Sequence, residues 1–357
     1  MTYDELLEIG PYDLRADEKR QLMTELLNTL TDHHRESCRF YDRVCGLLGD
    51  TRGSERSLED IPMVPVSLFK KQELSSIHKD DVFKIMTSSG TTGQLTSKIF
   101  LDRKTAGWQQ QTLERIVSSF IGSRRIPMLI VDSPNVLRDR NMFSARGAGI
   151  LGFSIFGSKR MYALNENMVP DPETIERFMA LTAGGPFLVF GFTYMIWKYF
   201  YEPLRKTGMK LPMEKGILIH GGGWKKLQKE AVSPSKFKDG IREVSGIERV
   251  YDYYGMAEQT GCIYMECECG HLHVSSYSDL IIRNMEDFSC CDTGTEGVIQ
   301  VLTPMAWSYP GHSILTEDKG VILGQDDCPC GRKGKYFKIT GRIPKAEIRG
   351  CSDTYEG

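Results

Sequence analysis

The sequence predicts an α/β fold. Short apolar runs recur along the chain, each followed by glycines or polar turns, at 128–131 (MLIV), 187–190 (FLVF), 217–219 (ILI) and 298–301 (VIQV). Amphipathic stretches lie between some of them, at 105–120 and 172–182. The short runs suit buried strands and the longer stretches suit covering helices, so their alternation favours a sheet with helices packed against it.

Composition and charge exclude several classes of protein. The chain has 357 residues, enough for one large or two ordinary domains, with 45 Lys plus Arg against 47 Asp plus Glu. A protein held to nucleic acid by bulk charge would be more basic, so we expect no nucleic-acid partner. We also expect no membrane span, because no run of about 18 apolar residues is present.

The chain contains ten cysteines, and the compartment decides their chemical state. Residues 1–5 (MTYDE) lack the basic and apolar regions of a signal peptide, so we expect a cytoplasmic protein. In that reducing compartment cysteines are thiols, metal ligands or nucleophiles more often than disulfides.

The first 60 residues predict a helical cap. Leucines at 22, 26, 27 and 30 recur at helical spacing within the stretch from Ala16 to Leu48. The segment 60–68 then carries two prolines, which predicts an extended crossing into the rest of the chain.

A loop rich in hydroxyls and glycine is the most informative motif. It follows a predicted strand at 82–86, has Lys98 close behind, and consists of Ser88, Ser89, Gly90, Thr91, Thr92 and Gly93. The glycines let backbone N–H groups turn toward a ligand, and the hydroxyls and lysine suit a triphosphate. It is not a Walker A loop, because Gln94 follows the second glycine. A plain surface loop is the alternative.

Four further segments accompany this loop, each weak by itself. They are 220–224 (HGGGW), 251–258 (YDYYGMAE), 316–318 (TED), and 340–342 (TGR) with 346–351 (AEIRGC) just beyond. Three glycines permit close backbone approach to a flat ligand. A carboxylate such as Glu258 commonly acts on phosphates through Mg²⁺.

Taken in order, these segments resemble the motifs of the adenylate-forming superfamily of acyl- and aryl-CoA ligases. Residues 88–93 resemble its phosphate loop, and 254–258 (YGMAE) resemble its Y-G-x-[TA]-E motif. Residues 316–318 resemble T-G-D, with Glu317 in place of the glycine, and Gly341-Arg342 resemble the G-R of its hinge. Within the superfamily the sequence is most similar to the acyl-protein synthetase (LuxE-type) family, and more distantly to phenylacetate-CoA ligases.

The resemblance implies the large N-terminal domain of an adenylate-forming enzyme. That domain, with zinc-binding loops, would span 61–340, after the helical cap at 1–60. Relatives with the full architecture carry a small C-terminal domain of about 100 residues after the hinge. Here we expect only a hinge and a short acyl-carrying tail at 341–357.

The resemblance also implies roles for individual residues. Ser88, Ser89, Thr91, Thr92 and Lys98 would hold the phosphates of ATP, in a loop shaped by Gly90 and Gly93. Glu258 would bind Mg²⁺, and Asp318 would hold the ribose. Gly222, Gly223, Tyr254 and Gly255 would border the adenine, and Arg342 would neutralise phosphate charge. Cys351 would receive the acyl group and pass it to a protein acceptor, such as an acyl reductase.

The residues around Cys351 agree with that role, because Arg349 lies nearby and a positive charge favours the thiolate. The expected activity is the activation of a carboxylic acid, namely a fatty acid, as acyl-AMP. The acyl group is then transferred to Cys351 and on to the protein acceptor. Two alternatives remain: an AMP-forming acyl- or aryl-CoA ligase, and a non-catalytic nucleotide-binding zinc module.

Two C-x-C pairs, each followed by glycine, predict a structural zinc site. The first lies in 267–273 (CECGHLH) and the second in 328–331 (CPCG). From the residues alone, six side chains compete for four positions. The phenylacetate-CoA ligase pattern implies Cys267, His273, Cys328 and Cys330, with Cys269 or His271 as substitutes.

Overall fold

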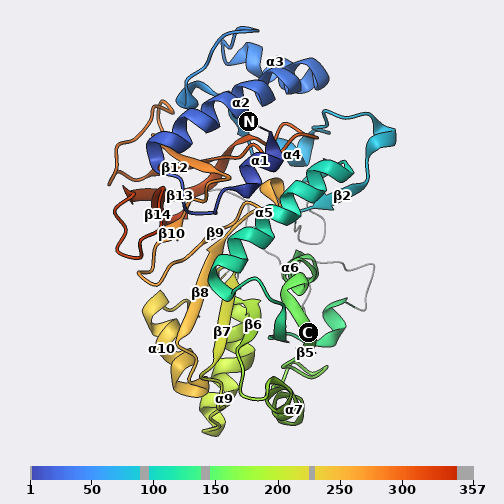
Figure 1. The fold of residues 1–357 in the computed structure, drawn as a ribbon, viewed down its shortest axis with the longest axis vertical. Coiled ribbons are helices and arrows are strands. Elements are labelled where there is room, and N and C mark those ends of the chain that lie inside the picture. Colours follow the sequence, from blue (N-terminus) through green and yellow to red (C-terminus); the bar gives the residue numbers. More distant parts are fainter. Residues whose placement is uncertain (1, 89–95, 138–144, 225–229, 344–357) are drawn as a thin grey trace. The chain divides into compact units, whose positions relative to one another are not determined.

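The computed structural model describes residues 2–88, 96–137, 145–224 and 230–343. They form two compact units, each described here by itself. Unit 1 comprises 2–88, 96–119 and 255–343, and unit 2 comprises 120–137, 145–224 and 230–254 (Figure 1).

Unit 2 is built on a parallel sheet. Its strands are β4 (Ile126–Ile130), β5 (Gly157–Tyr162), β6 (Phe187–Phe192), β7 (Gly216–Gly221) and β8 (Arg249–Tyr254), in the order β5-β4-β6-β7-β8. The helices between them are α6 (Ala145–Phe153), α7 (Pro172–Thr182), α8 (Thr193–Ile196), α9 (Glu202–Thr207) and α10 (Pro234–Ser245). Shorter turns are η3 (Pro134–Leu137), η5 (Ser154–Phe156) and the π-helical η6 (Trp197–Tyr201). The predicted α/β fold is confirmed.

Both faces of this sheet are covered, which explains why its central strands are continuous apolar runs. On one face, Leu129 of β4, Val189 of β6 and Leu218 of β7 belong to a core cluster with side chains of α7, η6, α9 and α10. On the other face, Phe153 of α6 stacks on Phe190 of β6, with ring centroids 4.2 Å apart.

The strand order reverses direction at β4. From β4 the chain moves outward to β5, and from β6 it moves the other way through β7 to β8. Open parallel sheets bind ligands at such a reversal, outside the carboxyl ends of their strands. The carboxyl ends of β4, β6, β7 and β8 therefore form the edge of unit 2 at which a ligand is expected.

Unit 1 combines N-terminal helices with antiparallel strands. Its helices are α1 (Tyr3–Glu8), α2 (Ala16–Ser37), α3 (Arg39–Leu47), α4 (Leu68–Lys71) and the first 17 residues of α5 (Arg103–Ile121). Its turns are η1 (Leu58–Asp60), η2 (Lys79–Asp81) and η8 (Ala257–Gln259). One sheet has the order β10-β14-β13-β12-β11, with β1 paired parallel to β13. A separate two-stranded sheet joins β2 to β3.

The strands of unit 1 differ widely in length. They are β1 (Val64–Pro65), β2 (Lys84–Thr87), β3 (Lys98–Leu101), β9 (Tyr264–Met265), β10 (Leu272–His273), β11 (Asp279–Arg283), β12 (Gly297–Leu302), β13 (Ser313–Gln325) and β14 (Lys335–Arg342). The long pair β13–β14 carries two register irregularities, between Lys319 and Gly320 and between Ile322 and Gly324.

Helix α2 is amphipathic and lies on the antiparallel sheet. Met23, Leu27 and Leu30 pack against Ile281 of β11 and Leu302 of β12. This contact ties the first 60 residues to the C-terminal strands of the same unit, far away in sequence.

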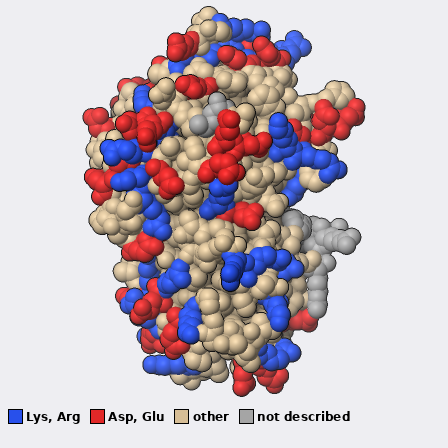
Figure 2. All heavy atoms as spheres, viewed as in Figure 1, with Lys and Arg blue, Asp and Glu red and all other residues tan. Residues whose placement is uncertain are grey.

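The surface and helices give two further observations. Basic and acidic side chains are intermixed on the face shown in Figure 2. Among the residues described, no helix has the length and apolar composition needed to cross a bilayer.

A histidine cluster lies within unit 1. His34 of α2 and His312 are fully buried, with ring centroids 4.9 Å apart. His34 Nδ1 lies 2.8 Å from Ser76 Oγ, and His312 Nε2 lies 3.0 Å from Thr31 Oγ1. Burial lowers the pKa of His312 to about 3 and the pKa of His34 well below its usual value. Both rings are therefore neutral in the folded protein near pH 7.

We predict that the protein loses stability as the pH falls below about 6.5. In the unfolded chain these histidines bind protons below that pH, whereas His312 in the folded chain resists protonation down to about 3. Stability is therefore fully present above pH 6.5 and declines toward pH 3, by at most roughly 1.4 kcal/mol per pH unit for each histidine. Urea unfolding at pH 7 and pH 4.5 measures the change.

His312→Gln should show a shallower pH dependence between those two values, and His78→Gln is the matched control because His78 is largely exposed. An identical slope for wild type and His312→Gln would show that the buried ring does not contribute.

Candidate active site

Glu258 is a buried carboxylate in unit 1. It lies in the turn η8 and its side chain is 2% exposed. The hydroxyl of Ser97 donates to Glu258 Oε1 at 2.6 Å, and the hydroxyl of Tyr309 donates to the Glu258 carbonyl oxygen at 2.8 Å. Both the side chain and the backbone of Glu258 are therefore held from outside its own turn.

A close backbone approach fixes the segment that follows Glu258. Gly261 adopts a φ of +91°, and a Cβ built there would lie 2.2 Å from the carbonyl oxygen of Gln109 in α5. Only glycine fits such an approach. The side chain of Gln109 in turn donates to the Met305 carbonyl oxygen at 3.0 Å and to Tyr309 Oη at 3.1 Å.

The strands β2 and β3 flank the hydroxyl–glycine loop. Thr87 pairs with Lys98 across this hairpin, and the Lys98 side chain is exposed. Ser88 follows β2 directly. The predicted phosphate-binding residues Ser89, Gly90, Thr91, Thr92 and Gly93 lie outside the described residues, as does Cys351.

The predicted ribose and hinge residues face each other across β13 and β14. Asp318 of β13 is the register partner of Arg342 of β14. Arg342 Nε lies 3.1 Å from Asp318 Oδ1, and Arg342 Nη2 lies 3.0 Å from Glu317 Oε2. In this structure the guanidinium is thus paired with both acids, and the sequence motifs did not predict the contact between Arg342 and Glu317.

In unit 2, the predicted adenine-bordering glycines lie at the carboxyl end of β7. Gly222 and Gly223 have φ values of +86° and +62°. A Cβ on Gly222 would lie 2.7 Å from Phe192 Cδ1, so this turn passes tightly over an aromatic ring. Tyr254 ends the adjacent strand β8, and Gly255 follows it in unit 1 with an exposed backbone.

His220 precedes those glycines. Its Nδ1 lies 3.0 Å from Thr193 Oγ1 and 3.5 Å from Asp252 Oδ1. Burial, together with the nearby Lys238, lowers the pKa of His220 to about 3. The neutral ring serves to join the ends of β6, β7 and β8.

A buried ion pair lies just beyond the end of β4, at the strand reversal. Asp132 is 1% exposed and its Oδ2 lies 3.1 Å from Nε of Arg146 on α6. Burial raises the pKa of Asp132 to about 6, although the Arg146 charge opposes this shift. Sequence reasoning missed this pair, because a lone Asp after an apolar run is usual at strand ends.

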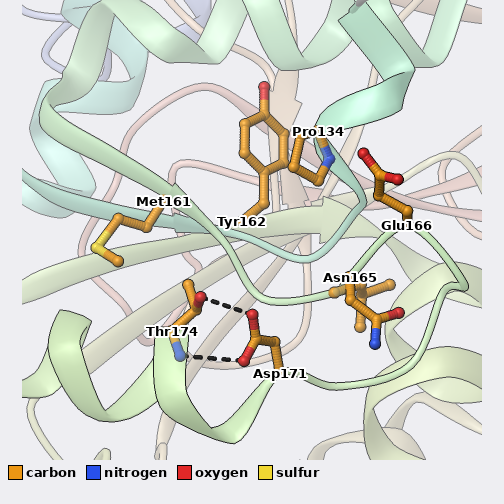
Figure 3. Close-up of a pocket in the computed structure, with 8 residues that line it drawn as sticks. Pro134, Met161, Tyr162, Asn165, Glu166, Asp171 and Thr174 are labelled. Carbon is orange, nitrogen blue, oxygen red and sulfur yellow. Dashed lines mark hydrogen bonds between the residues drawn. The ribbon is translucent and has the colours of Figure 1, made fainter.

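Unit 2 also has an open groove of about 340 Å³ beside the end of β5 (Figure 3). Three of its polar side chains, those of Asn165, Asp171 and Thr174, are engaged in local structure. Asp171 caps α7 by accepting from the Thr174 backbone N–H and hydroxyl, and Asn165 Oδ1 accepts from the N–H groups of Asn167 and Val169. The lining is Pro134, Met161, Tyr162, Leu164, Asn165, Glu166, Asp171 and Thr174.

A compact set of metal-binding side chains lies in unit 1. One ligand atom from each of Cys267, His273, Cys328 and Cys330 falls within 4.8 Å of the others. Cys267 Sγ and Cys328 Sγ are 3.9 Å apart, and Cys330 Sγ is 3.3 Å from His273 Nε2. Two sulfurs bound tetrahedrally to zinc at about 2.3 Å lie roughly 3.8 Å apart, so the donor set fits this ion.

The neighbouring candidates differ from these four. Cys269 is exposed, and its backbone N–H donates to Cys267 Sγ at 3.4 Å. His271 Nδ1 lies 3.3 Å from Cys328 Sγ, while its ring stacks on Tyr336. Burial, with help from Arg332, lowers the pKa of His273 to about 4, which leaves the neutral imidazole that binds metals.

The N-terminal residues close over these cysteine loops. The N–H of Lys333 donates to the Tyr12 carbonyl oxygen at 3.1 Å, and the Tyr12 ring meets the His273 ring edge-on. Lys19 of α2 is buried and donates to the Ser275 carbonyl oxygen at 3.3 Å. Three distant parts of the sequence therefore meet around one small cluster.

Solved structures with a similar fold are adenylate-forming ligases. An open conformation of 2-hydroxyisobutyryl-CoA ligase, in complex with 2-HIB-AMP and CoA, matches 95% of this chain and 78% of its own, with a TM-score of 0.70 and 19% identity. The same ligase in a postadenylation state with 2-HIB-AMP matches 93% of this chain and 69% of its own, with a TM-score of 0.68 and 19% identity. The predicted adenylate-forming fold is confirmed.

Proteins with similar sequences identify the family within these ligases. The long-chain-fatty-acid–luciferin-component ligase of Vibrio harveyi is 22% identical, over 98% of this chain and 91% of its own. The ligase of the same description from Aliivibrio fischeri is 20% identical, over 96% of this chain and 90% of its own. The family model for acyl-protein synthetase, LuxE, matches residues 2–356. This chain belongs to that family, and it is a ligase.

Proposed function

We propose that this ligase activates a long-chain fatty acid with ATP and Mg²⁺, and then carries the acyl group on Cys351 to a protein acceptor such as an acyl reductase. The match of an acyl-protein synthetase family over residues 2–356 carries this proposal. The name shared by the relatives from Vibrio harveyi and Aliivibrio fischeri supports a long-chain fatty acid as substrate and a luciferin component as its acceptor.

In the first half-reaction, a carboxylate oxygen of the acid attacks the α-phosphorus of ATP. The P–O bond to pyrophosphate breaks, pyrophosphate leaves, and acyl-AMP remains. The chain's part is to position the two anions and neutralise their charge. Lys98, Ser88 and the loop residues 89–93 would hold phosphates, and Gly222, Gly223, Tyr254 and Gly255 would border the adenine.

Three charged side chains of unit 1 would complete the nucleotide site. Glu258 would ligate Mg²⁺, which would supply positive charge against the phosphates. Asp318 would accept hydrogen bonds from the ribose. Arg342 would exchange its present partners, Glu317 and Asp318, for phosphate oxygens as the hinge at 341–342 moves.

In the second half-reaction, the Cys351 thiolate attacks the acyl carbonyl carbon. A C–S bond forms, the C–O bond to AMP breaks, and AMP leaves. The thioester keeps the acyl group activated for the acceptor. In this proposal residues 341–357 form the hinge and the acyl-carrying tail.

We further propose that Cys267, His273, Cys328 and Cys330 hold a structural Zn²⁺. Four closed cysteine and histidine ligands with no carboxylate are typical of structural zinc, whereas catalytic zinc keeps an open position. The ion would join the β9–β10 and β13–β14 loops beneath the N-terminal segment.

Glu258→Gln should abolish acyl-AMP formation while leaving the fold intact. Loss of the carboxylate charge leaves Mg²⁺ weakly held, so we expect acid-dependent pyrophosphate release to fall roughly 100-fold or more. Glu296→Gln, which changes a surface acid paired with Lys319, is the control and should keep the wild-type rate. Normal turnover of Glu258→Gln at ordinary Mg²⁺ would exclude the role.

Freshly isolated, chelator-free protein should contain about one zinc per chain, measured by elemental analysis. Cys328→Ser should lose the metal and unfold at lower temperature, because an organising ligand is gone. Cys269→Ser should retain both. The ligand set is wrong if Cys328→Ser keeps its zinc and its full thermal stability.

Cys351→Ser should separate the two half-reactions. Pyrophosphate release should survive, whereas self-acylation should disappear because a serine hydroxyl is far less ionised than a thiol. Intact-protein mass spectrometry after incubation with ATP, Mg²⁺ and a fatty acid should show a hydroxylamine-labile acyl adduct on wild type and on Cys290→Ser, but none on Cys351→Ser.

An equal adduct on wild type and Cys351→Ser would move the acyl site to another cysteine. No adduct on any variant, together with CoA-dependent release of AMP, would favour an acyl-CoA ligase instead.

A further inference from the structure

Ser97 joins the base of the hydroxyl–glycine loop to Glu258. It directly precedes β3 and is completely buried. Its backbone N–H donates to Ser88 Oγ at 2.9 Å, and its carbonyl oxygen accepts from the Ser88 N–H at 3.2 Å. These two bonds fasten the first residue of the loop, Ser88, to a residue that follows the loop in sequence.

The side chain of Ser97 makes a separate contact, with Glu258. Its hydroxyl donates to Glu258 Oε1 at 2.6 Å, across 161 positions of sequence. Both side chains are buried, so water competes little for this bond. A hydroxyl bonded to a buried carboxylate is a short, charge-assisted contact of the stronger kind.

The backbone and the carboxylate of Glu258 have different anchors. Tyr309 fixes the main chain through the Glu258 carbonyl oxygen. That bond leaves the three side-chain torsions of a glutamate undetermined, whereas the hydroxyl of Ser97 bonds directly to Oε1 of the carboxylate. A carboxylate that ligates a metal must present its oxygens within a few tenths of an ångström of the required position.

We propose that Ser97 is a positioning residue for the adenylation half-reaction: it orients the Glu258 carboxylate toward Mg²⁺ and couples that orientation to the base of the phosphate loop. This inference rests on the proposed function, because it needs Glu258 to act on Mg²⁺·ATP. Ser97 itself touches neither the metal nor the nucleotide in this scheme. Its effect reaches the reaction only through Glu258.

The test compares Ser97→Ala, Ser97→Thr and Ser308→Ala with wild type, by acid-dependent pyrophosphate release over a range of Mg²⁺ concentrations. Ser97→Ala should lower kcat about 10-fold or more and raise the Mg²⁺ concentration for half-maximal rate, as expected for a lost bond to a charged group. The KM for the fatty acid should not change. Ser97→Thr keeps the hydroxyl and should restore most of the rate.

Ser308→Ala is the matched control. Ser308 is also fully buried in unit 1, and its hydroxyl donates to the Phe100 carbonyl oxygen of β3 at 2.9 Å, so this variant loosens the same strand without touching Glu258. It should lower thermal stability and keep the wild-type Mg²⁺ dependence. Should Ser97→Ala fail to fold, Ser97→Cys, with its weak S–H donor, should give a rate well below that of Ser97→Thr.

Three results would overturn the inference. One is an unchanged kcat and Mg²⁺ dependence in folded Ser97→Ala or Ser97→Cys. Another is an equal change in Ser308→Ala, which would mean that β3 packing alone is responsible. If wild type adenylates acids and either result appears, only the role of Ser97 fails. The third is the absence of acid-dependent pyrophosphate release from wild type, which would remove the proposed function and this inference together.

Discussion

The burial of one carboxylate, that of Glu258, constrains much of unit 1. Taking a charged carboxylate out of water is costly unless hydrogen bonds and a cation compensate it. The fold supplies a hydroxyl at each end of the residue, from Ser97 and from Tyr309. The Tyr309 hydroxyl is itself engaged by Gln109 of α5, and Gly261 lets the same helix approach the turn. The nucleotide site that we propose therefore depends on contacts made well away from the nucleotide.

The cysteine–histidine cluster is a second centre of contacts in unit 1. The first of its two loops is flanked by β9 and β10, which have two residues each, so the sheet alone provides little to hold that loop. The N-terminal segment adds backbone bonds, the Tyr12 ring and the buried ammonium group of Lys19. Burial lowers the pKa of Lys19 to about 8, although the Asp279 carboxylate opposes this shift, and the ammonium group donates to the Ser275 carbonyl oxygen. The proposed zinc ion would bind the two cysteine loops together, and the contacts of Tyr12 and Lys19 tie the N-terminal segment to them.

Local sequence signals were sufficient for many elements. The helix α7 begins and ends where predicted, because Asp171 and Pro172 form a standard start and glycines follow its end. The apolar runs became β4, β6, β7 and β12, with ends that differ from the predicted ones by at most two residues. The length of β13 was not predictable, since Thr316, Glu317 and Asp318 interrupt its apolar pattern and its partners come from distant strands.

The candidate site likewise contains residues that the sequence predicted and residues that it did not. The spacing of the two C-x-C pairs predicted a metal site. The choice of four metal ligands among six candidates requires knowing which side chains point toward one another. Glu258 and Asp318 belong to motifs that can be recognised in the sequence. The roles of Ser97 and Arg146, and the pairing of Arg342 with Glu317, depend on contacts between residues far apart in the chain. A single residue in a sequence gives no sign of such a contact. Tertiary contacts, rather than local pattern, define these residues.

The most direct test of the account is isotope exchange between labelled pyrophosphate and ATP by the wild-type protein, with no CoA and no acyl acceptor present. Formation of acyl-AMP is reversible while the adenylate stays bound, so exchange reports the first half-reaction alone. The account predicts exchange that requires Mg²⁺ and a long-chain fatty acid together. Absence of acid-dependent exchange across saturated acids of different length, in folded protein that binds ATP, would contradict it.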